Sequence, residues 1–175
     1  MIQLVRREFM FMAKKEIAQF DKLVEEYTKH PKVLEMKKYK HHGIERFDHC
    51  KRVAYFTYHV TKLLHLNVES ATKGAFLHDF FTDEVMEEGA ISKLRWHPEI
   101  AAENAREYFG LNDMEEDIIV RHMFPITFIP PRYLEGWIVD IIDDLTSIYE
   151  RGYSMKKQFA PAMNAFVLFI LTIIK

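Results

Sequence analysis

Apolar residues recur along this chain at steps of three and four, which is the spacing of helices that bury one face. Glycine and proline number only 6 each among 175 residues, so long periodic stretches run without a break. The pattern predicts an all-α fold and argues against a β-sandwich or a barrel. No internal repeat, low-complexity segment or linker divides the sequence. We therefore expect a single domain over residues 1–175, with a helical core at about 46–150.

Two helices are predicted in the first third of the chain. The first runs from about Leu4 to Tyr27, within an N-terminal helical segment (residues 1–45) that breaks at Pro31. The second runs from about Arg46 to Leu66. Its predicted apolar stripe consists of Val53, Phe56, Val60 and Leu63 or Leu64.

Three shorter helices are expected next, at about 70–79, 100–109 and 113–122. Proline suits a first helical position, so Pro98 is expected to open the second of them, with His97 at the helix cap. Gly110 would close that helix, and Pro125 follows the end of the third.

The last third of the chain predicts two more helices. The first spans Leu134 to Tyr149, with an apolar stripe of Ile138, Ile141, Ile142, Leu145, Ile148 and Tyr149. Asp140, Asp143 and Asp144 lie on the same helix. The helical wheel alone does not decide which of them points inward, and two are expected to be ordinary solvated acids. A separate final helix is expected at about 154–174, with a kink or its true start at Pro161.

Charge and cysteine content indicate which partners and which cellular compartment to expect. The formal charge is −2 and the basic residues are interleaved with acidic ones, so no basic stripe predicts a nucleic-acid partner. Cys50 is the only cysteine, which excludes an intrachain disulfide and favours the cytoplasm. Arg6, Arg7 and Glu8 come after only a few apolar residues, which is not the pattern of a signal peptide.

The run from Ala165 to Ile174 is apolar on every side of a helix. Ten helical residues reach about 15 Å, against a hydrocarbon core of about 30 Å, so we expect no membrane partner. An exposed helix of this kind would promote aggregation. We expect one face on the domain core and the other against a second protomer, most simply in a two-fold homodimer. A chain that ends after Met163 is then expected to be monomeric or insoluble.

The strongest chemical signal is the adjacent pair His78 and Asp79 within the apolar stretch 75–81. Burying a carboxylate costs on the order of several kcal/mol unless it is paired or binds a metal. Imidazole nitrogen and carboxylate oxygen are ordinary ligands of Zn, Fe and Mn, and an ion between the two side chains could bind both. The alternative is a helix end, with His78 in the core and Asp79 as a cap. His49 lies on the core face of the preceding helix, so it is either a core histidine or a third ligand.

The order His49, then His78-Asp79, then an aspartate on a later helix resembles the HD superfamily of metal-dependent phosphohydrolases. Residues 49–54 are similar to the first-histidine helix of that family, residues 74–79 to its signature pair, and residues 97–101 to an HPEIG-like segment of many members. Residues 119–122 resemble a segment with a further family histidine. Alignment of the helix at 138–145 puts Asp143 at the last ligand position. The likeness covers roughly Phe47 to Tyr149.

The resemblance implies a ligand set and a chemistry. His49, His78, Asp79 and Asp143 would hold one divalent ion (Mn, Fe, Co or Zn), and His97 and His122 would add a second, with Asp79 as the bridge. Such ions lower the pKa of bound water and polarise a phosphoryl oxygen, so His78 and Asp79 are the expected catalytic pair. With a single ion, His97 would be a helix cap and His122 an imidazole at the edge of the core.

One feature departs from the family. Many members continue His-Asp with Ile-Gly-Lys, in which the lysine lies near the substrate phosphate, whereas Phe80, Phe81 and Thr82 follow Asp79 here. That phosphate contact is therefore missing or comes from another cation. The basic residues that flank the predicted site segments, each more often a solvated charge, are Lys93, Arg95, Arg121 and Arg132.

These features together predict a phosphohydrolase that acts on a phosphate ester or anhydride, with a nucleotide-like small molecule as substrate and attack by a metal-bound water. One alternative is a cyclic-dinucleotide or guanosine-tetraphosphate hydrolase, since the sequence offers no base-reading pocket to separate these substrates. Another is a non-catalytic HD-like binding or signalling module. Such modules typically lose ligands, and this sequence keeps the whole set.

Overall fold

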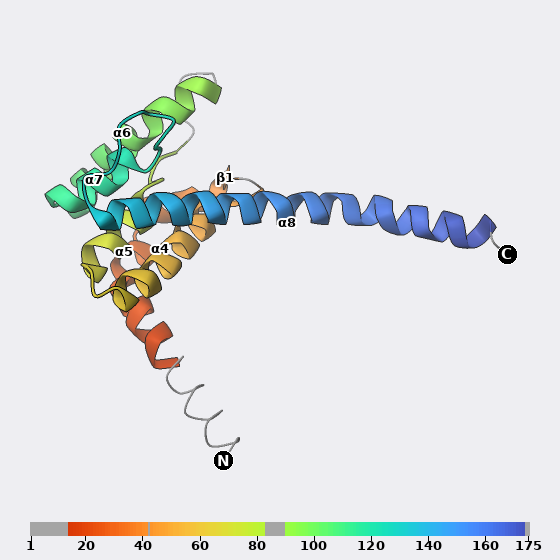
Figure 1. The fold of residues 1–175 in the computed structure, drawn as a ribbon, viewed down its shortest axis with the longest axis horizontal. Coiled ribbons are helices and arrows are strands. Elements are labelled where there is room, and N and C mark those ends of the chain that lie inside the picture. Colours follow the sequence, from red (N-terminus) through yellow and green to blue (C-terminus); the bar gives the residue numbers. More distant parts are fainter. Residues whose placement is uncertain (1–13, 42, 83–89, 174–175) are drawn as a thin grey trace, which may run out of the picture.

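The computed structural model describes residues 14–41, 43–82 and 90–173, with side chains for 14–40, 43–82 and 96–154. Helices dominate this part of the chain (Figure 1), which confirms the predicted all-α fold. The longer helices are α4 (Arg46–Leu63), α5 (Val68–Leu77), α6 (Ala90–Phe109), α7 (Asp113–Arg121) and α8 (Leu134–Ile173). A small antiparallel hairpin of two-residue strands, β1 (Lys40–His41) and β2 (Ile44–Glu45), leads into α4.

Short helical segments precede the hairpin. Residues 14–23 are helical, and a turn at Val24 interrupts the helix that was predicted from Leu4, whose start lies outside the described residues. The segments that follow are α2 (Glu25–Lys29), α3 (Pro31–Leu34) and the 3-10 helix η1 (Glu35–Lys38). The break predicted at Pro31 is therefore confirmed.

The core forms where α4, α5 and α7 pack together. Phe20 from the N-terminal segment meets the rings of Tyr55 and Tyr58 of α4 edge-on. On α5, a Cβ added at Gly74 would come within 2.8 Å of the Ile118 side chain of α7. Glycine at this position therefore permits the close approach of the two helices.

The buried face of α4 differs from the predicted stripe. Val53 is fully buried, but Phe56, Leu63 and Leu64 are exposed. The residues that α4 buries are Arg46, Phe47, His49, Cys50, Val53, Ala54, Thr57, Tyr58 and Thr61. Small and threonine side chains at many of these positions let α5 and α8 approach α4 closely, whereas Phe56, Leu63 and Leu64 point outward. The prediction from residue size and hydropathy was therefore wrong for most of this stripe.

Helix α6 begins well before the predicted start. It runs from Ala90, so Pro98 lies inside the helix and does not open it. His97 is accordingly a helical residue and not a cap, which corrects the prediction. An internal proline removes one backbone hydrogen bond. The helix nevertheless continues on both sides of Pro98, and it places the buried His97 toward the centre of the domain.

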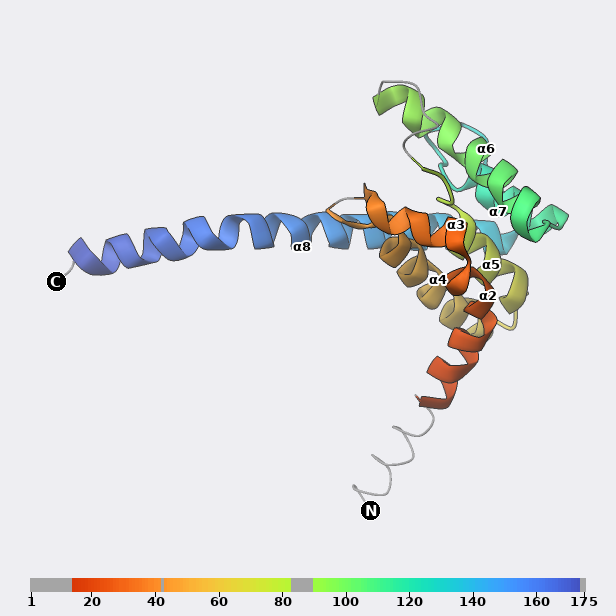
Figure 2. The ribbon, with the colours of Figure 1, turned by 180° about the vertical axis from the view of Figure 1, so that it is seen from behind.

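Helix α8 is one continuous helix of 40 residues where two were predicted. It passes through Pro161 without ending, and no new helix begins at 154. Figures 1 and 2 show the second half of α8 leading away from all the other elements. The predicted packing of the run from Ala165 on the domain core is therefore wrong, while the predicted contact with a second protomer stays a prediction.

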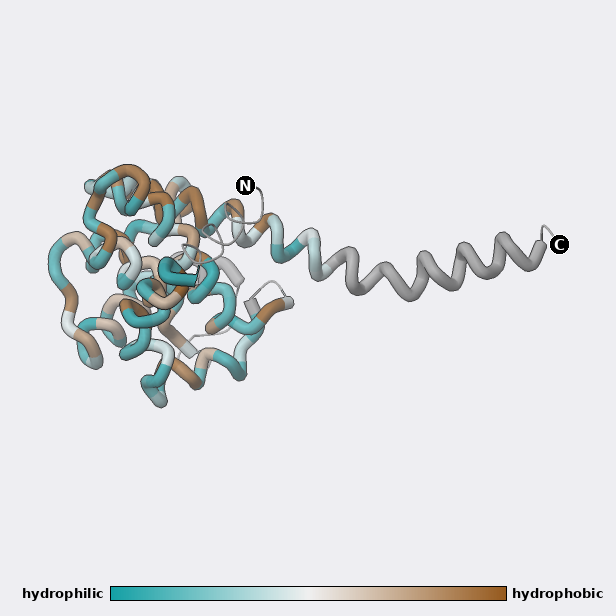
Figure 3. The backbone as a smooth tube through the Cα atoms, turned by 90° about the horizontal axis from the view of Figure 1, so that it is seen from below, coloured by the Kyte–Doolittle hydropathy of each residue, from teal (hydrophilic) through white to brown (hydrophobic). Residues whose placement is uncertain are grey.

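The apolar stripe predicted for the first half of α8 is mostly exposed. Ile138 is buried, but Ile141, Leu145, Ile148 and Tyr149 are exposed. The side chains that α8 buries are largely polar, namely Glu135, Asp140, Asp143, Thr146 and Glu150. Figure 3 shows hydrophobic and hydrophilic residues alternating along this part of the helix. The polar face turns inward because the partners it meets are the polar groups of the site described below.

No helix among the described residues combines the length and the apolar character that crossing a bilayer requires.

Candidate metal centre

The six histidine and aspartate side chains predicted as ligands meet in the interior of the domain. His49 comes from α4, His78 and Asp79 from the end of α5, His97 from α6, His122 from the end of α7 and Asp143 from α8. All six are buried. The structure thus gathers residues that lie up to 94 positions apart in the chain, from 49 to 143.

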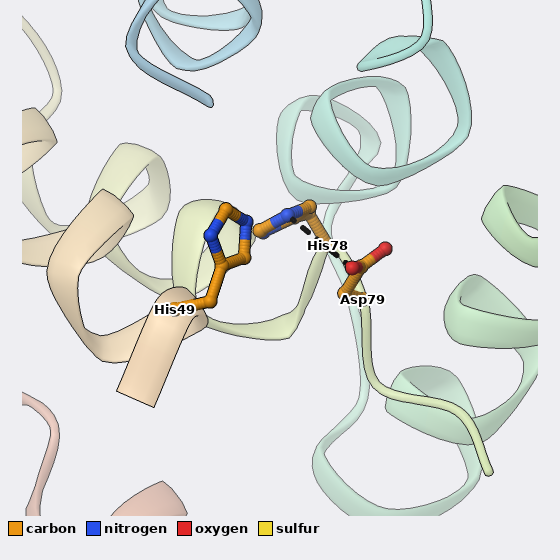
Figure 4. A group of neighbouring side chains, drawn as sticks. All are labelled: His49, His78 and Asp79. Carbon is orange, nitrogen blue, oxygen red and sulfur yellow. Dashed lines mark ion pairs between the residues drawn. The ribbon is translucent and has the colours of Figure 1, made fainter. Parts of the chain in front are cut away.

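The end of α5 turns the His-Asp pair toward this centre. His78 is the C-cap of the helix, and the Phe80 N–H donates to the Leu77 carbonyl at 3.0 Å. Because the chain leaves the helix here, both side chains of the pair face inward. Figure 4 shows the rings of His49 and His78 side by side, with Asp79 next to His78.

Two of the imidazoles are held in a defined tautomer by the backbone. The Nδ1–H of His78 donates to the Ala75 carbonyl at 2.8 Å, and the Nδ1–H of His122 donates to the Ile119 carbonyl at 2.7 Å. Each Nε2 therefore presents a lone pair to the centre, which is how proteins orient histidine ligands. The buried Nε2 of His78 makes no hydrogen bond, and such an atom suits a metal ion. On this observation, the residues present fit a metal site.

One side of the centre combines His49, His78 and Asp143. The Asp143 Oδ1 lies 2.8 Å from the His49 Nε2 and 3.7 Å from the His78 Nε2. The Asp79 Oδ2 lies 4.0 Å from the same His78 atom. Two ligands that are each about 2.1 Å from one ion lie roughly 3–3.5 Å apart. These donor atoms are thus close to the spacing that one ion requires.

The other side of the centre combines Asp79, His97 and His122. The Asp79 Oδ1 lies 3.3 Å from the His97 Nε2 and 3.8 Å from the His122 Nε2, and the two Nε2 atoms are 3.0 Å apart. Asp79 thus presents Oδ2 to His78 and Oδ1 to the other two histidines. Three sets of donor atoms lie within 4.8 Å of one another: His49/His78/Asp79, His78/His122/Asp143 and Asp79/His97/His122.

Electrostatics put two of these groups in the protonation state that binds a metal. Burial alone raises the pKa of Asp143, but the proximity of His78 and the hydrogen bond from His49 hold the pKa well below its usual range. Burial, together with His78 and His97, lowers the pKa of His122 to about 3. At neutral pH Asp143 is therefore a carboxylate and His122 a neutral imidazole, which are the forms that coordinate.

His49 behaves differently. Burial opposes its positive charge, but hydrogen bonds to Asp143 and Glu150 raise the pKa of His49 to about 10. A metal ion at this position competes with the proton on Nε2, so binding there releases a proton.

A family model described as HD domain matches residues 46–148, which is more than half of the chain. The chain belongs to the HD domain family. This confirms the resemblance, and it implies a place in the superfamily of metal-dependent phosphohydrolases. Searches of curated proteins and of solved structures gave no significant match.

The structure of this HD domain adds Glu150, which the sequence reading missed. Glu150 is fully buried, its Oε2 lies 2.9 Å from the His49 Nδ1, and its Oε1 accepts a hydrogen bond from Arg52. A carboxylate on the far nitrogen of a ligand histidine fixes the orientation of the ring. The available signal was the spacing from Asp143, since seven residues make two helical turns and keep both carboxylates on one face.

The structure also adds Arg46 beside the His-Asp pair. Its Nη1 donates to the Phe81 carbonyl at 2.9 Å, its Nε lies 4.0 Å from the Asp79 Oδ2, and its guanidinium stacks 3.8 Å from the Phe81 ring centroid. Arg46 is buried in the first turn of α4, three residues before His49. The arginine side chains considered from sequence lie elsewhere, since both Arg121 and Arg132 pair with Asp117. The side chains of Lys93 and Arg95 lie outside the described residues.

The three aspartates of α8 have different surroundings. Asp143 points into the centre and Asp144 is exposed, which agrees with the alignment of the helix. Asp140 was expected to be solvated if Asp143 pointed inward, and this is wrong because Asp140 is buried. Burial, together with the charges of Asp144 and Asp143, raises the pKa of Asp140 to about 7.

Proposed function

We propose that this HD domain is a metal-dependent phosphohydrolase that cleaves a phosphate ester or anhydride of a small, nucleotide-like molecule. The observation that carries the proposal is the convergence of buried imidazole Nε2 atoms, two of them fixed by backbone carbonyls, with the carboxylates of Asp79 and Asp143. A protein rarely buries so many ionisable groups together without a ligand to hold. The nucleotide as substrate rests on the family resemblance alone.

In this proposal His49, His78, Asp79 and Asp143 hold one divalent ion. His97 and His122 hold a second ion with Asp79 as the bridge, and the support for this is that the two Asp79 oxygens face different histidines. When bound, such ions activate a water molecule and polarise the phosphoryl oxygen. Mixed nitrogen and oxygen ligands suit Mn, Fe, Co and Zn alike.

Other residues of the chain support this site. Glu150 holds the His49 ring, and Arg46 keeps a positive charge close to Asp79. Phe80 and Phe81 are buried beside the pair and exclude bulk water from it. We also propose a cytoplasmic location, supported by a single cysteine that is fully buried.

A non-catalytic binding module is the rival proposal. The complete and buried ligand set favours the enzyme, because a module that only binds has no need for a centre with two carboxylates and four histidines. Phosphate release separates the two proposals.

The test is phosphate release from a panel of nucleotides that includes cyclic dinucleotides and guanosine tetraphosphate, with Mn, Co, Fe and Zn added in turn. We expect turnover of at least one substrate by the wild type and a loss of at least about 100-fold in Asp79→Asn. The matched control is Asp144→Asn, an exposed carboxylate on α8 that should leave the rate unchanged. A metal-loaded wild type that turns over no substrate in the panel would favour the binding module.

A further inference from the structure

A row of large apolar side chains stands exposed where α8 leaves the domain. Ile141, Leu145 and Ile148 are 54%, 62% and 69% exposed, and they follow one another at steps of four and three. Asp143 and Glu150 lie on the opposite side of the helix and face the metal centre. Helix α8 thus has one face for the site and another apolar face that no described residue covers.

The same spacing continues along the rest of the helix. Beyond Ile148, steps of four and three reach glycine at 152, methionine at 155, phenylalanine at 159, 166 and 169, alanine at 162 and isoleucine at 173. The backbone is helical throughout this range. An unbroken row of apolar residues and one glycine with alternating steps of four and three is the pattern of a coiled coil. We call positions 141 to 173 of this row the α8 seam.

Between residues 141 and 158, where polar residues fill most of the other positions, the period of the α8 seam favours a partner helix over a lipid surface. A straight helix drifts by about 20° per heptad relative to a repeat of 3.5 residues, so such a repeat stays in contact only with a helix that supercoils around it. A helix that lies on a membrane has no reason to keep this repeat. The seam therefore favours another helix as its occupant.

A groove of about 540 Å³ lies beside the seam between α4 and α8. It is lined mainly by apolar side chains, among them Phe56, Val60, Leu145 and Tyr149. Phe56 was predicted to be buried, and its exposure is explained if another surface covers it. The apolar surface at the domain end of α8 therefore extends from the seam into a groove.

The chain cannot cover this groove with its own α8. Figures 1 and 2 show that the second half of the helix leads away from the domain, and the helix does not fold back. Among the described residues, nothing lies beneath the second half of α8 and no helix lies in the groove. A second copy supplies what each of them lacks.

We propose that two copies of the chain pair through antiparallel α8 helices, each laying its second half along the seam and the groove of the other. The spacing of the seam is symmetric about residue 157, because 141 and 173 average to 157. Position 148 then lies opposite 166, position 145 opposite 169, and glycine 152 opposite alanine 162. The phenylalanine positions 166 and 169 of one copy thereby lie at the groove of the other copy, and the small residues at 152 and 162 lie opposite each other. A parallel pair would instead place the second half of each α8 beside the second half of the other, away from both grooves.

The first test is the mass of the intact protein in solution, measured by light scattering without detergent. We expect a dimer, and a monomer for the double variant Leu145→Glu/Ile148→Glu with unchanged metal content. The control is Phe128→Glu, which alters a side chain that is 86% exposed outside the seam and should leave the dimer intact. A monomeric wild type, a seam variant that stays dimeric, or a wild type recovered only on phosphatidylglycerol vesicles would each overturn the proposal.

The second test fixes the orientation by disulfide formation. Cys50 is fully buried, so introduced cysteines dominate the reaction. The double variant Ile148→Cys/Phe166→Cys should form a covalent dimer. Ile148→Cys alone should not, because the two copies of position 148 would be about 27 Å apart, 18 residues at about 1.5 Å each. A covalent dimer of Ile148→Cys alone would show a parallel pair and overturn the proposed orientation.

Discussion

Asp79 illustrates how much a single residue does in this centre. Its two oxygens face different histidines, and Arg46 lies beside one of them. Three of the histidine ligands depend on a second group outside the centre, because a backbone carbonyl or a carboxylate fixes the far nitrogen of His78, His122 and His49. Substitutions of single residues should therefore separate ligands from supports.

Asp143 and Asp144 are adjacent carboxylates with opposite surroundings. Asp143→Asn should weaken metal binding by more than the roughly 10–100-fold that loss of an outer support causes, because it removes a donor oxygen from the centre. Asp144→Asn should bind metal as the wild type does. Titration with Mn or Zn measures both affinities. Equal loss in the two variants would show that the charge of α8 matters and not the position of Asp143.

Glu150 supports His49 without reaching the centre. Glu150→Gln should lower metal affinity roughly 10–100-fold, because an amide holds the imidazole less firmly than a carboxylate does. The exposed Glu103 on α6 offers a matched control, since Glu103→Gln should change nothing. The affinity is again read from metal titration. An unchanged affinity in Glu150→Gln would exclude the supporting role.

Asp140 should make folding stability depend on pH. Its pKa is about 7 in the folded protein against an ordinary value of 3.8, so between these values the unfolded chain loses a proton that the folded protein keeps. Stability contributed by this group is then full below about pH 4 and falls as the pH rises toward 7. Asp140→Asn should be more stable than the wild type at pH 8, by on the order of 1 kcal/mol after solvent screening, and no more stable at pH 4. Urea unfolding at the two pH values tests this, and a benefit of equal size at both would contradict it.

For the helices, the sequence predicted well where most of them occur, but it predicted poorly which side of each helix faces the core. The periodic pattern places α4, α5, α7 and the start of α8 close to where the structure has them. The pattern assigns the wrong face of α4 and α8 to the core. Hydropathy predicts that Phe56 and Leu145 point inward, but both are exposed and polar residues are buried on these helices instead. The metal centre reverses the usual pattern, since its ligands and their supports need the interior.

The ligand positions show what the sequence could supply. His78 and Asp79 stand out in an apolar stretch, and family resemblance singles out Asp143 where the helical wheel could not. Glu150 and Arg46 could not be assigned a place, because their roles depend on contacts between helices far apart in the chain. The long α6 could not be predicted either, since the proline at 98 normally marks a helix start.

The packing of α5 against α7 offers a prediction at this scale. Gly74→Ala should destabilise the fold by about 1–3 kcal/mol, because the new Cβ would lie 2.8 Å from the Ile118 side chain. Glu103→Ala on α6, which alters an exposed side chain, should instead change the stability by no more than about 0.5 kcal/mol. Urea unfolding measures both changes. Equal effects of the two substitutions would show that α5 and α7 are not closely packed at this point.

At the scale of the whole molecule, one helix joins two functions. The first half of α8 contributes Asp143 and Glu150 to the centre, and the opposite face belongs to the proposed dimer contact. Metal ligands that come from three helices and from the ends of two others make the centre a cross-link between distant parts of the chain. A bound ion should accordingly stabilise the domain as well as equip it for chemistry.

The metal content of purified protein tests the central claim most directly. After loading with Mn or Zn and removal of free ions, the wild type should retain about two ions per chain, His97→Ala about one, and Asp79→Ala close to none, since Asp79 is the proposed bridge. Circular dichroism checks that each variant is folded. An Asp79→Ala protein that is folded and retains as much metal as the wild type would contradict the account.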